Sequence, residues 1–183
     1  LRGGLKRATR VVEQLLSLAR EDHAPARAPH VAVDLAALAR DVVAAHAGIA
    51  AAKDVDLGAE HLEALTVEGD SGALATLAAN LVDNALRYTP PGGHVDVIVE
   101  RRDGAPALIV RDDGPGIPAA ERAQVFERFA RGSHADAPGS GLGLAIVERI
   151  AERHDAQVTL ADGPGGRGLE AVVRFGGGAS VSR

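Results

Sequence analysis

Residues 139–147, with the sequence GSGLGLAIV, constrain the fold most, because a glycine-rich turn runs there without a break into an amphipathic helix. Its three glycines, two residues apart, allow the backbone to approach a ligand closely. The helix, which we expect to continue to about His154, begins with unpaired backbone N–H groups that favour an anion. The segment therefore predicts a phosphate-binding turn, although a tight loop without a ligand has the same pattern.

The composition limits the classes of protein and site that are possible. The 183 residues suffice for one domain with an appendage, and the core must be aliphatic because only four residues are aromatic. A formal net charge of −5, without a long basic run, argues against a nucleic-acid partner. The absence of cysteine excludes disulfides and thiolate metal sites. We expect a soluble fragment of a longer protein, since no long apolar run, signal peptide or methionine is present.

The first part of the chain differs in pattern from the rest. Residues 1–21 carry apolar groups at alternating spacings of four and three, which predicts a helix that packs in a bundle. An ordinary amphipathic helix packed on its own domain is the alternative. Residues 22–29 contain two prolines and predict a linker. Residues 30–176 then form the main domain, and 177–183 a flexible tail. The apolar seam consists of Leu1, Leu5, Ala8, Val12, Leu15 and Ala19.

Strand and helix patterns alternate through the main domain. Asp34 and Asp70 can each cap the helix that follows. Residues 131–139 have the composition of a mobile loop and suggest a lid. We predict helices over 35–52, 71–88, 118–129 and from the glycine-rich turn to 154. We predict a strand over 30–33 and strand pairs over 55–59 with 64–68, 94–102 with 107–111, and 157–161 with 169–175.

The helix over 71–88 carries a polar face separate from its apolar face. At about 100° per residue, Asn80, Asn84, Arg87 and Tyr88 fall together. Two asparagines four residues apart can direct side-chain oxygens to one point, and Mg²⁺ accepts such oxygens beside phosphate oxygens. Arg87 is placed to meet a phosphate. The alternative is that the asparagines are caps or surface residues.

Asp112 ends a strand that looks buried and is followed by Gly114 and Gly116. The glycines would let a flat ring lie against the backbone while the carboxylate accepts a hydrogen bond from an exocyclic amine. That geometry suits adenine. A turn that closes a hairpin would use the same residues.

These segments, in this order, resemble the sequence boxes of sensor histidine kinases. Residues 80–88 (NLVDNALRY) resemble the N box, 112–116 the G1 box, 125–129 (VFERF) the F box and 139–143 (GSGLG) the G2 box. The resemblance covers about residues 30–175 and extends to the wider superfamily of gyrase, Hsp90 and MutL.

The N-terminal segment indicates which branch of this superfamily the chain resembles. Residues 8–20 resemble the second helix of the dimerisation domain that precedes the catalytic domain in such kinases. This favours the histidine kinases over the gyrase and Hsp90 branches, and over stand-alone serine kinases that act as anti-sigma factors.

The resemblance implies an α/β fold, a two-layer Bergerat-type sandwich in which a mixed sheet is backed by helices, preceded by one helix of a dimerisation bundle. It implies that ATP and Mg²⁺ are bound, and that the γ-phosphate is transferred to a histidine upstream for relay to the aspartate of a response regulator receiver domain. The implied parent protein is a homodimeric inner-membrane sensor, and this chain belongs to its cytoplasmic portion.

By position in the motifs, Asn84 would be the main Mg²⁺ ligand with Asn80 beside it, and Asp112 would bind the adenine amine. Arg131, just after the F box, resembles the arginine that approaches the γ-phosphate, so Asn80 and Arg131 are the implied catalytic residues. The implied nucleotide-binding residues are Asn80, Asn84, Arg87, Tyr88, Asp112, Gly114, Gly116, Ile117, Phe129, Arg131, Ser140, Gly141, Leu142 and Gly143.

The histidines depart from the family pattern, in which the phosphorylated histidine stands in a His-(Glu/Asp)-x-x-x-Pro setting. No histidine of this chain has that setting, so we interpret all seven as surface or packing residues and expect no self-phosphorylation. Residues 154–156 (HDA) stand where His-Gly-Gly is usual, which leaves the turn into the last hairpin open. The seven are His23, His30, His46, His61, His94, His134 and His154.

Two other functions remain open at this point. A non-catalytic ATP-sensing module would bind ATP without transferring its phosphate. An ATP hydrolase of the Hsp90 or MutL kind would need a glutamate at position 80 to activate water, and Asn80 is a poor base.

Overall fold

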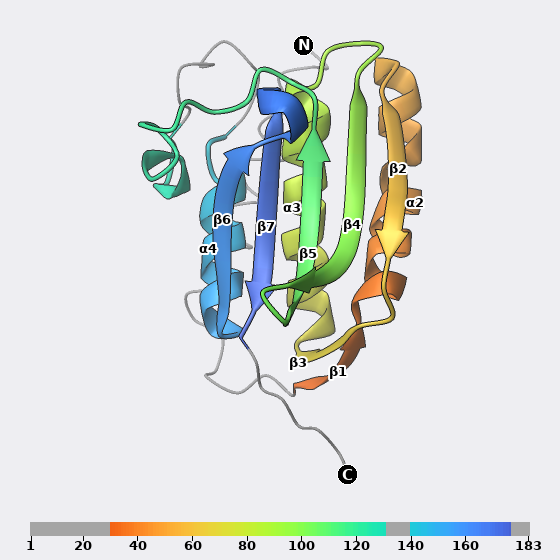
Figure 1. Cartoon of the computed structure of the whole chain (residues 1–183), viewed down its shortest axis with the longest axis vertical. Helices are drawn as coiled ribbons and strands as arrows, with labels where there is room; N and C mark the ends of the chain where they lie inside the picture. The colour runs from red at the N-terminus through yellow and green to blue at the C-terminus, as the bar shows by residue number, and fades with distance from the viewer. Residues whose placement is uncertain (1–29, 131–139, 177–183) are drawn as a thin grey trace, which may run out of the picture.

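The computed structural model describes residues 30–130 and 140–176 (Figure 1). The predicted bundle helix, linker, lid and tail lie outside these residues. The elements are β1 (Val31–Asp34), α2 (Leu35–Lys53), β2 (Asp56–Leu62), β3 (Thr66–Gly69), α3 (Ser71–Tyr88), β4 (His94–Arg102), β5 (Ala105–Asp112), α4 (Gly143–Arg153), β6 (Ala156–Asp162) and β7 (Leu169–Phe175), with 3₁₀ turns at Gln124–Phe126 and Pro164–Gly166.

A five-stranded sheet forms one layer, in the order β2-β4-β5-β7-β6. β2 and β4 are parallel and the other neighbours are antiparallel. Figure 1 shows α2, α3 and α4 side by side behind this sheet. The prediction of a mixed sheet backed by helices is confirmed, as are the pairings of β4 with β5 and of β6 with β7.

The predicted pairing of residues 55–59 with 64–68 is wrong. β2 pairs with β4, whereas β3 pairs with β1 in a separate two-stranded sheet. The intervening residues form no hairpin turn, because the Glu63 N–H donates to the Val99 carbonyl (2.8 Å) and so extends the contact with β4. Leu65 is then buried and its carbonyl accepts from the Leu35 N–H (2.9 Å), which directs the chain toward β1.

The predicted helix over 118–129 is also wrong, since only Gln124–Phe126 forms a 3₁₀ turn. Glu127 is extended, with a ψ of 146°, and Phe129 has a φ of 67°, so neither residue can continue a helix. The Phe129 N–H instead donates to the Gly141 carbonyl at 2.9 Å. This bond holds the segment against the glycine-rich turn.

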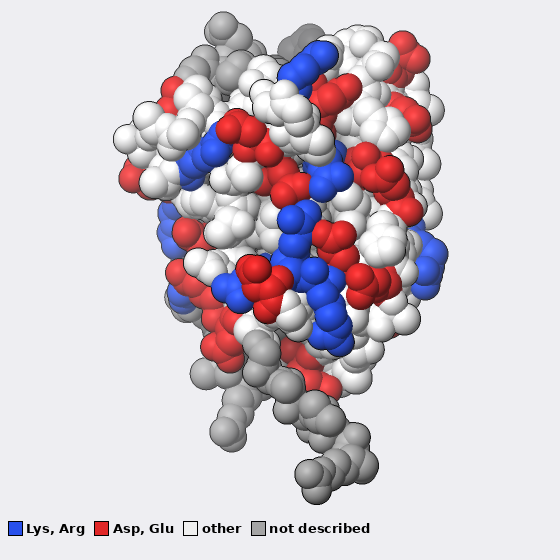
Figure 2. All heavy atoms as spheres, viewed as in Figure 1, with Lys and Arg blue, Asp and Glu red and all other residues white. Residues whose placement is uncertain are grey.

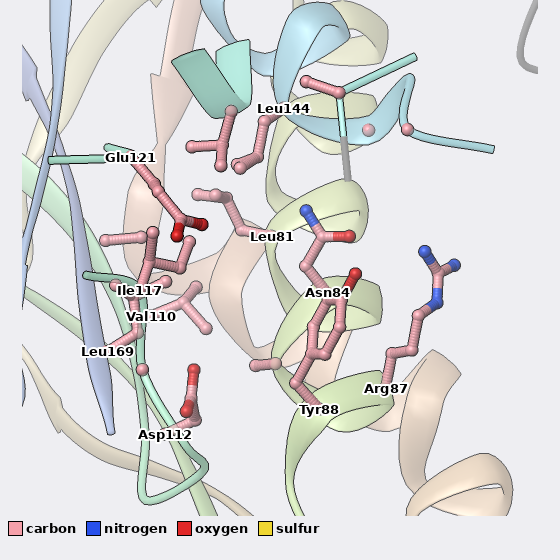
Figure 3. A pocket seen from close by; sticks show the side chains of 17 residues that line it. Leu81, Asn84, Arg87, Tyr88, Val110, Asp112, Ile117, Glu121, Leu144 and Leu169 are labelled. Carbon is pink, nitrogen blue, oxygen red and sulfur yellow. The ribbon is translucent and has the colours of Figure 1, made fainter. Parts of the chain in front are cut away.

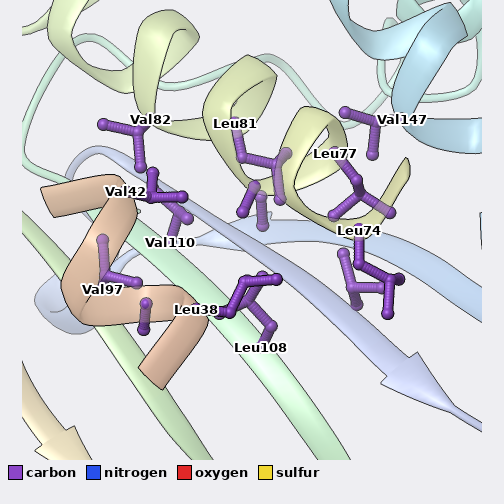
Figure 4. Packing of buried hydrophobic residues seen from close by; sticks show 14 of the residues in the cluster. Leu38, Val42, Leu74, Leu77, Leu81, Val82, Val97, Leu108, Val110 and Val147 are labelled. Atoms are coloured by element: carbon purple, nitrogen blue, oxygen red, sulfur yellow. The ribbon is translucent and has the colours of Figure 1, made fainter. Parts of the chain in front are cut away.

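Aliphatic side chains from α2, α3 and α4 fill the space between the helices and the sheet (Figure 4). α3 contributes the row Leu74, Leu77 and Leu81, which is 0 to 2% exposed. Opposite it lie Leu108 and Val110 of the sheet. Burial of such side chains supplies most of the stabilisation of a core.

By length and composition α2 is apolar enough to cross a membrane, contrary to our expectation from the sequence. Alanines make up much of its 19 residues. In the structure the apolar face of α2 packs into the core, where Leu35, Leu38, Ala39 and Val42 are buried. This is the packing of a core helix.

The predicted caps are confirmed. The Asp34 carboxylate accepts from the Ala36 and Ala37 N–H groups at 2.8 and 3.0 Å. The Asp70 carboxylate accepts from the Gly72 and Ala73 N–H groups at 2.9 and 3.1 Å. Both caps satisfy backbone donors at the start of a helix, as expected for aspartate at this position.

His154 is a packing residue, as we interpreted it. Its Nε2 accepts from the Asp70 N–H (3.0 Å) and its Nδ1 lies 2.7 Å from the Ile150 carbonyl, so the end of α4 is tied to the start of α3. Asp155 then has a φ of 49°, a conformation that glycine favours. The turn into β6 therefore forms with aspartate where His-Gly-Gly is usual.

The sheet face away from the helices carries charges of both signs (Figure 2). The Arg111 guanidinium donates to Glu170 at 3.0 and 2.6 Å, and Arg102 lies 3.6 Å from the same carboxylate. Beneath these side chains Ile98 and Ile109 belong to a small apolar cluster. The stems of long charged side chains can cover such a cluster.

Gly48 offers a direct test of the α2 assignment. It lies in the interior of the helix, and a Cβ built there meets no heavy atom within 4 Å. Gly48→Ala is therefore expected to raise the free energy of unfolding by about 0.5–1 kcal/mol in urea titrations. Ala47→Gly, at an exposed neighbouring position, should lower it by a similar amount. No gain from Gly48→Ala would contradict a helix at this position.

Candidate functional site

A cavity opens beside α3, with an empty volume of about 910 Å³ that includes the open solvent at its mouth. α3 forms one wall, the end of β5 and the following loop form the other, and the start of α4 closes one side (Figure 3). The first two walls are far apart in sequence. The sheet register and the packing of α3 on β5 bring them together.

The polar face predicted on α3 reaches this cavity. Asn84, Arg87 and Tyr88 line it, and Figure 3 shows the Asn84 amide directed toward it. Asn80 lies one turn earlier, where its Nδ2 donates to the Thr76 carbonyl at 2.8 Å. A Cβ built on Gly143 would lie 3.3 Å from Asn84 Oδ1 and 3.4 Å from Asn80 Oδ1. The two asparagines therefore meet the backbone at the start of α4.

Asp112 lies at the other end of the cavity and is only 8% exposed. Burial raises the pKa of its carboxyl to about 6, against the opposing effect of hydrogen bonds from the Gly114 and Leu169 backbone. The Gly114 N–H donates at 2.9 Å and fixes the carboxylate. Figure 3 shows this carboxylate directed into the cavity, where it can accept a hydrogen bond from a ligand.

The glycine-rich turn lies against the segment that contains Phe129. Gly141 has a φ of 70°, and a Cβ built there would lie 2.6 Å from the Phe129 carbonyl carbon. Only glycine fits this conformation and this approach without strain. Gly141, Gly143 and Leu144 then line the cavity, with α4 beginning at Gly143.

The structure brings most of the predicted site residues together. Gly116 and Ile117 line the cavity with those named above. Others lie beside it. Gly114 holds Asp112, the Ser140 hydroxyl accepts from the Leu142 N–H at 3.2 Å, and the Leu142 side chain is fully buried in the core. Phe129 is 61% exposed next to Ala130, which lines the cavity. Arg131 lies outside the described residues.

Comparison with known families identifies the class of protein. A family model described as "Histidine kinase-, DNA gyrase B-, and HSP90-like ATPase" matches residues 69–179. The chain belongs to this ATPase family. It is the catalytic ATP-binding domain of a sensor histidine kinase, which confirms the relationship inferred from the four boxes.

Sensor kinases are among the relatives of this ATPase domain. Sensor protein kinase PmrB of Pseudomonas aeruginosa is 42% identical over 170 residues, which span 92% of this chain and 35% of PmrB. The kinase/phosphatase MprB of Mycobacterium bovis is 50% identical over 104 residues, 55% of this chain and 21% of MprB. The chain thus spans about a third or less of these relatives.

Solved structures agree with this assignment. The mycobacterial sensor histidine kinase MprB has a TM-score of 0.68 at 31% identity, covering 80% of this chain and 97% of that one. Full-length ShkA, in complex with AMPPNP, has a TM-score of 0.75 at 29% identity, covering 91% of this chain and 35% of ShkA.

Sequence reasoning missed the apolar walls of the ATPase cavity. Val110 and Asp112 point to the same face of β5, and β7 places Ala171 and Leu169 opposite them. Alternation along β5 could have identified Val110, whereas the two β7 residues required the strand register. Glu121 also lines the cavity, and no sequence signal marked it.

The raised pKa of Asp112 predicts a pH-dependent cost to stability in the unliganded ATPase domain. The pKa of its carboxyl is about 6 in the folded chain and ordinarily 3.8, so the folded state binds the proton more tightly than the unfolded state does. The free energy of unfolding therefore falls as the pH rises from about 4 through 6. Asp112→Asn removes this cost and should raise the free energy of unfolding at pH 7 by roughly 2–3 kcal/mol.

Urea titrations at two pH values would measure this effect. We expect the gain from Asp112→Asn to shrink to below about 1 kcal/mol at pH 4, where the wild-type carboxyl is largely protonated in the folded state. Asp41→Asn, at an exposed position of α2, controls for the loss of one negative charge. An equal gain at both pH values would contradict the assigned cause.

Proposed function

We propose that this domain binds Mg²⁺·ATP in the cavity and transfers the γ-phosphate to a histidine that lies upstream in the parent protein. The observation that supports this most is the convergence of Asn84, Asp112 and Gly143 on one cavity, with Asn80 next to Gly143. An adenine amine would donate to Asp112, while the phosphates would lie near Asn84 and the first turn of α4.

The apolar walls suit the adenine ring. Val110, Ile117 and Leu169 line the cavity near Asp112 in Figure 3, with Tyr88 on the side of α3. A flat aromatic ring between such side chains loses its contact with water. The buried Asp112 carboxylate then selects a base that carries an amine, because a base carbonyl at that place would donate no hydrogen bond to it.

The side-chain oxygens of the site suit one hard cation that also binds the phosphates of the nucleotide. Asn84 Oδ1 and Asn80 Oδ1 lie close together at Gly143, and neutral oxygens of this kind serve as Mg²⁺ ligands. Among residues 30–130 and 140–176, no group of three or more histidine, aspartate or glutamate residues could hold a metal alone. Mg²⁺, when bound, would neutralise charge on the phosphates.

The remaining roles concern positioning. Arg87 lines the cavity and can orient a phosphate, and Arg131 is proposed to approach the γ-phosphate from the segment after the F box. With Asn80 in place of an acid, the site holds no base at this position to activate water. The arrangement therefore favours transfer to a positioned acceptor over hydrolysis.

We propose further that the parent protein is a homodimeric membrane sensor whose cytoplasmic part includes this domain and acts on a response regulator receiver domain. The named relatives are sensor kinases, and a solved neighbour is the cytoplasmic segment of the histidine kinase QseC, with a TM-score of 0.63 at 30% identity. Both points support the proposal by analogy.

Phosphoryl transfer can be tested with γ-labelled ATP. The chain alone should take up no label, whereas a separate fragment of the parent protein that carries the acceptor histidine should become labelled when mixed with it. Tight ATP binding without any transfer to this fragment would instead favour the alternative of a non-catalytic ATP-sensing module.

ATP binding by the wild-type chain and by Asp112→Asn can be compared by calorimetry. The hydrogen bond to a charged group contributes about 1.5–3 kcal/mol, so the variant should bind ATP roughly tenfold or more weakly. This loss should accompany the gain in stability described above. Unchanged affinity would remove the assignment of Asp112 to the adenine amine.

A further inference from the structure

The C-terminal end of α3 is held by a lysine that belongs to none of the four boxes. Lys53, the last residue of α2, donates from its ammonium group to the carbonyls of Leu86 and Arg87, and its Nζ lies 3.1 Å from the Arg87 oxygen. Carbonyls in the last turn of a helix have no partner within the helix, so a cation there both donates hydrogen bonds and interacts favourably with the helix dipole. Lys53 therefore caps the helix that carries Asn84.

Partial burial makes this contact costly to lose. Lys53 is half-buried, and burial lowers the pKa of its ammonium group, with the positive charge of Arg87 acting in the same direction. A charged group that is partly removed from water needs hydrogen-bond partners, and the two carbonyls supply them. Hydrogen bonds in such a setting are stronger than those on an open surface. The end of α2 and the end of α3 are therefore held together at this point.

The two residues that line the cavity from the last turn of α3 are held by different groups. Tyr88 is followed by Thr89, whose N–H and hydroxyl both donate to a carbonyl one turn earlier, at 2.9 and 2.8 Å. A Cβ built on Gly114 would lie 3.1 Å from the Tyr88 carbonyl oxygen, so the segment after β5 packs against it. The Arg87 carbonyl is instead held by Lys53. Loss of the Lys53 ammonium group should therefore affect Arg87 more than Tyr88.

We propose that Lys53 is a positioning residue, which holds the last turn of α3 so that the Arg87 side chain meets the phosphates of ATP. The inference rests on the proposed function, because it requires that ATP occupies the cavity with its phosphates near Arg87. In Figure 3 the Arg87 side chain extends from the end of α3 toward the level of Asn84, on the phosphate side of the proposed site. Lys53 is not among the described residues that line the cavity, so its effect on ATP must pass through the end of the helix.

The test measures the affinities of the full chain for Mg²⁺·ATP and for adenosine by calorimetry. Lys53→Met keeps most of the aliphatic stem but removes the ammonium group, and it should weaken ATP binding about fivefold. Adenosine lacks phosphates and should bind this variant within about twofold of wild type. Lys53→Arg can donate to the same carbonyls and should restore most of the affinity for ATP. Ala47→Gly, at an exposed position of α2, also destabilises that helix but leaves the end of α3 unchanged, so this control should alter neither affinity.

Arg87→Ala completes a double-mutant cycle. If Lys53 acts through Arg87, Lys53→Met should cause no further loss of ATP affinity, within about twofold, once Arg87 is alanine. Equal losses in both backgrounds would mean that the Lys53 charge attracts the phosphates directly, and would overturn the assignment. Unchanged ATP binding by Lys53→Met, or an equal loss for ATP and adenosine, would overturn it as well while leaving the proposed function intact. Absence of ATP binding by wild type would overturn the proposed function and this inference with it.

Discussion

Asn84→Ala is expected to lower phosphoryl transfer to the acceptor fragment at least about a hundredfold. Asn84 is the side chain of α3 that both lines the cavity and reaches the start of α4, where its Oδ1 would lie 3.3 Å from a Cβ on Gly143. The loss removes the proposed Mg²⁺ ligand next to the phosphates, where charge stabilisation contributes several kcal/mol to phosphoryl transfer.

The fold should tolerate this change. Alanine has a higher helix propensity than asparagine, so α3 is expected to remain intact. Calorimetry with adenosine separates the two ends of the cavity, because adenosine lacks phosphates and should bind Asn84→Ala as it binds wild type. Thr76→Ala, two turns earlier on α3 and outside the cavity, is the matched control. Wild-type transfer by Asn84→Ala would remove the metal assignment.

Gly168→Ala is expected to destabilise the fold by about 3 kcal/mol or more. Gly168 has a φ of 72°, and a Cβ built there would overlap the Asp112 carbonyl oxygen. Relief of this overlap requires the backbone after β5 to move away from the start of β7. Because that movement displaces Asp112, ATP binding should weaken together with stability.

Gly165→Ala provides a matched control in the same hairpin loop. Gly165 has a φ of 70°, but a Cβ built there meets no heavy atom within 4 Å. In this variant alanine must adopt the left-handed backbone conformation, which lowers the free energy of unfolding by only about 1 kcal/mol. Urea titration of both variants therefore separates conformational strain from overlap. Equal losses at the two positions would contradict the close approach of Gly168 to Asp112.

Local signals in the sequence predicted three of the four helices expected in the main domain, and two of its three strand pairs. Asp34 and Asp70 each combine a cap with an apolar period, and the two helices begin at the next residue. The hairpin of β4 and β5 turns at Asp103 and Gly104, both of which have positive φ. Turn chemistry of this kind is readable from sequence because it depends on neighbouring residues.

Contacts between segments that are distant in sequence could not be predicted from such local signals. An alternating pattern predicts a strand but does not name its partner, so the sequence could not show that β2 pairs with β4 and β3 with β1. The helix predicted over 118–129 failed for a related reason. Phe129 adopts its φ of 67° in a bond to Gly141, which is distant in sequence.

The site residues show the same difference between local and non-local signals. The polar residues Asn84 and Asp112 stand in motifs, and the structure places both on one cavity. The apolar wall depends on strand register, which brings Leu169 opposite Asp112. Glu121 lies between two motifs, and only the packing of its segment shows that it faces the cavity.

The most direct test of the whole account is a crystal structure of the chain with Mg²⁺ and AMPPNP. We expect the adenine amine within about 3 Å of the Asp112 carboxylate, and Mg²⁺ about 2.1 Å from the Asn84 side-chain oxygen and bound to the phosphates. A nucleotide bound elsewhere, such as in the groove between α2 and α3 that Ala45 and Ala79 line, would contradict the convergence of these residues on one ATP molecule.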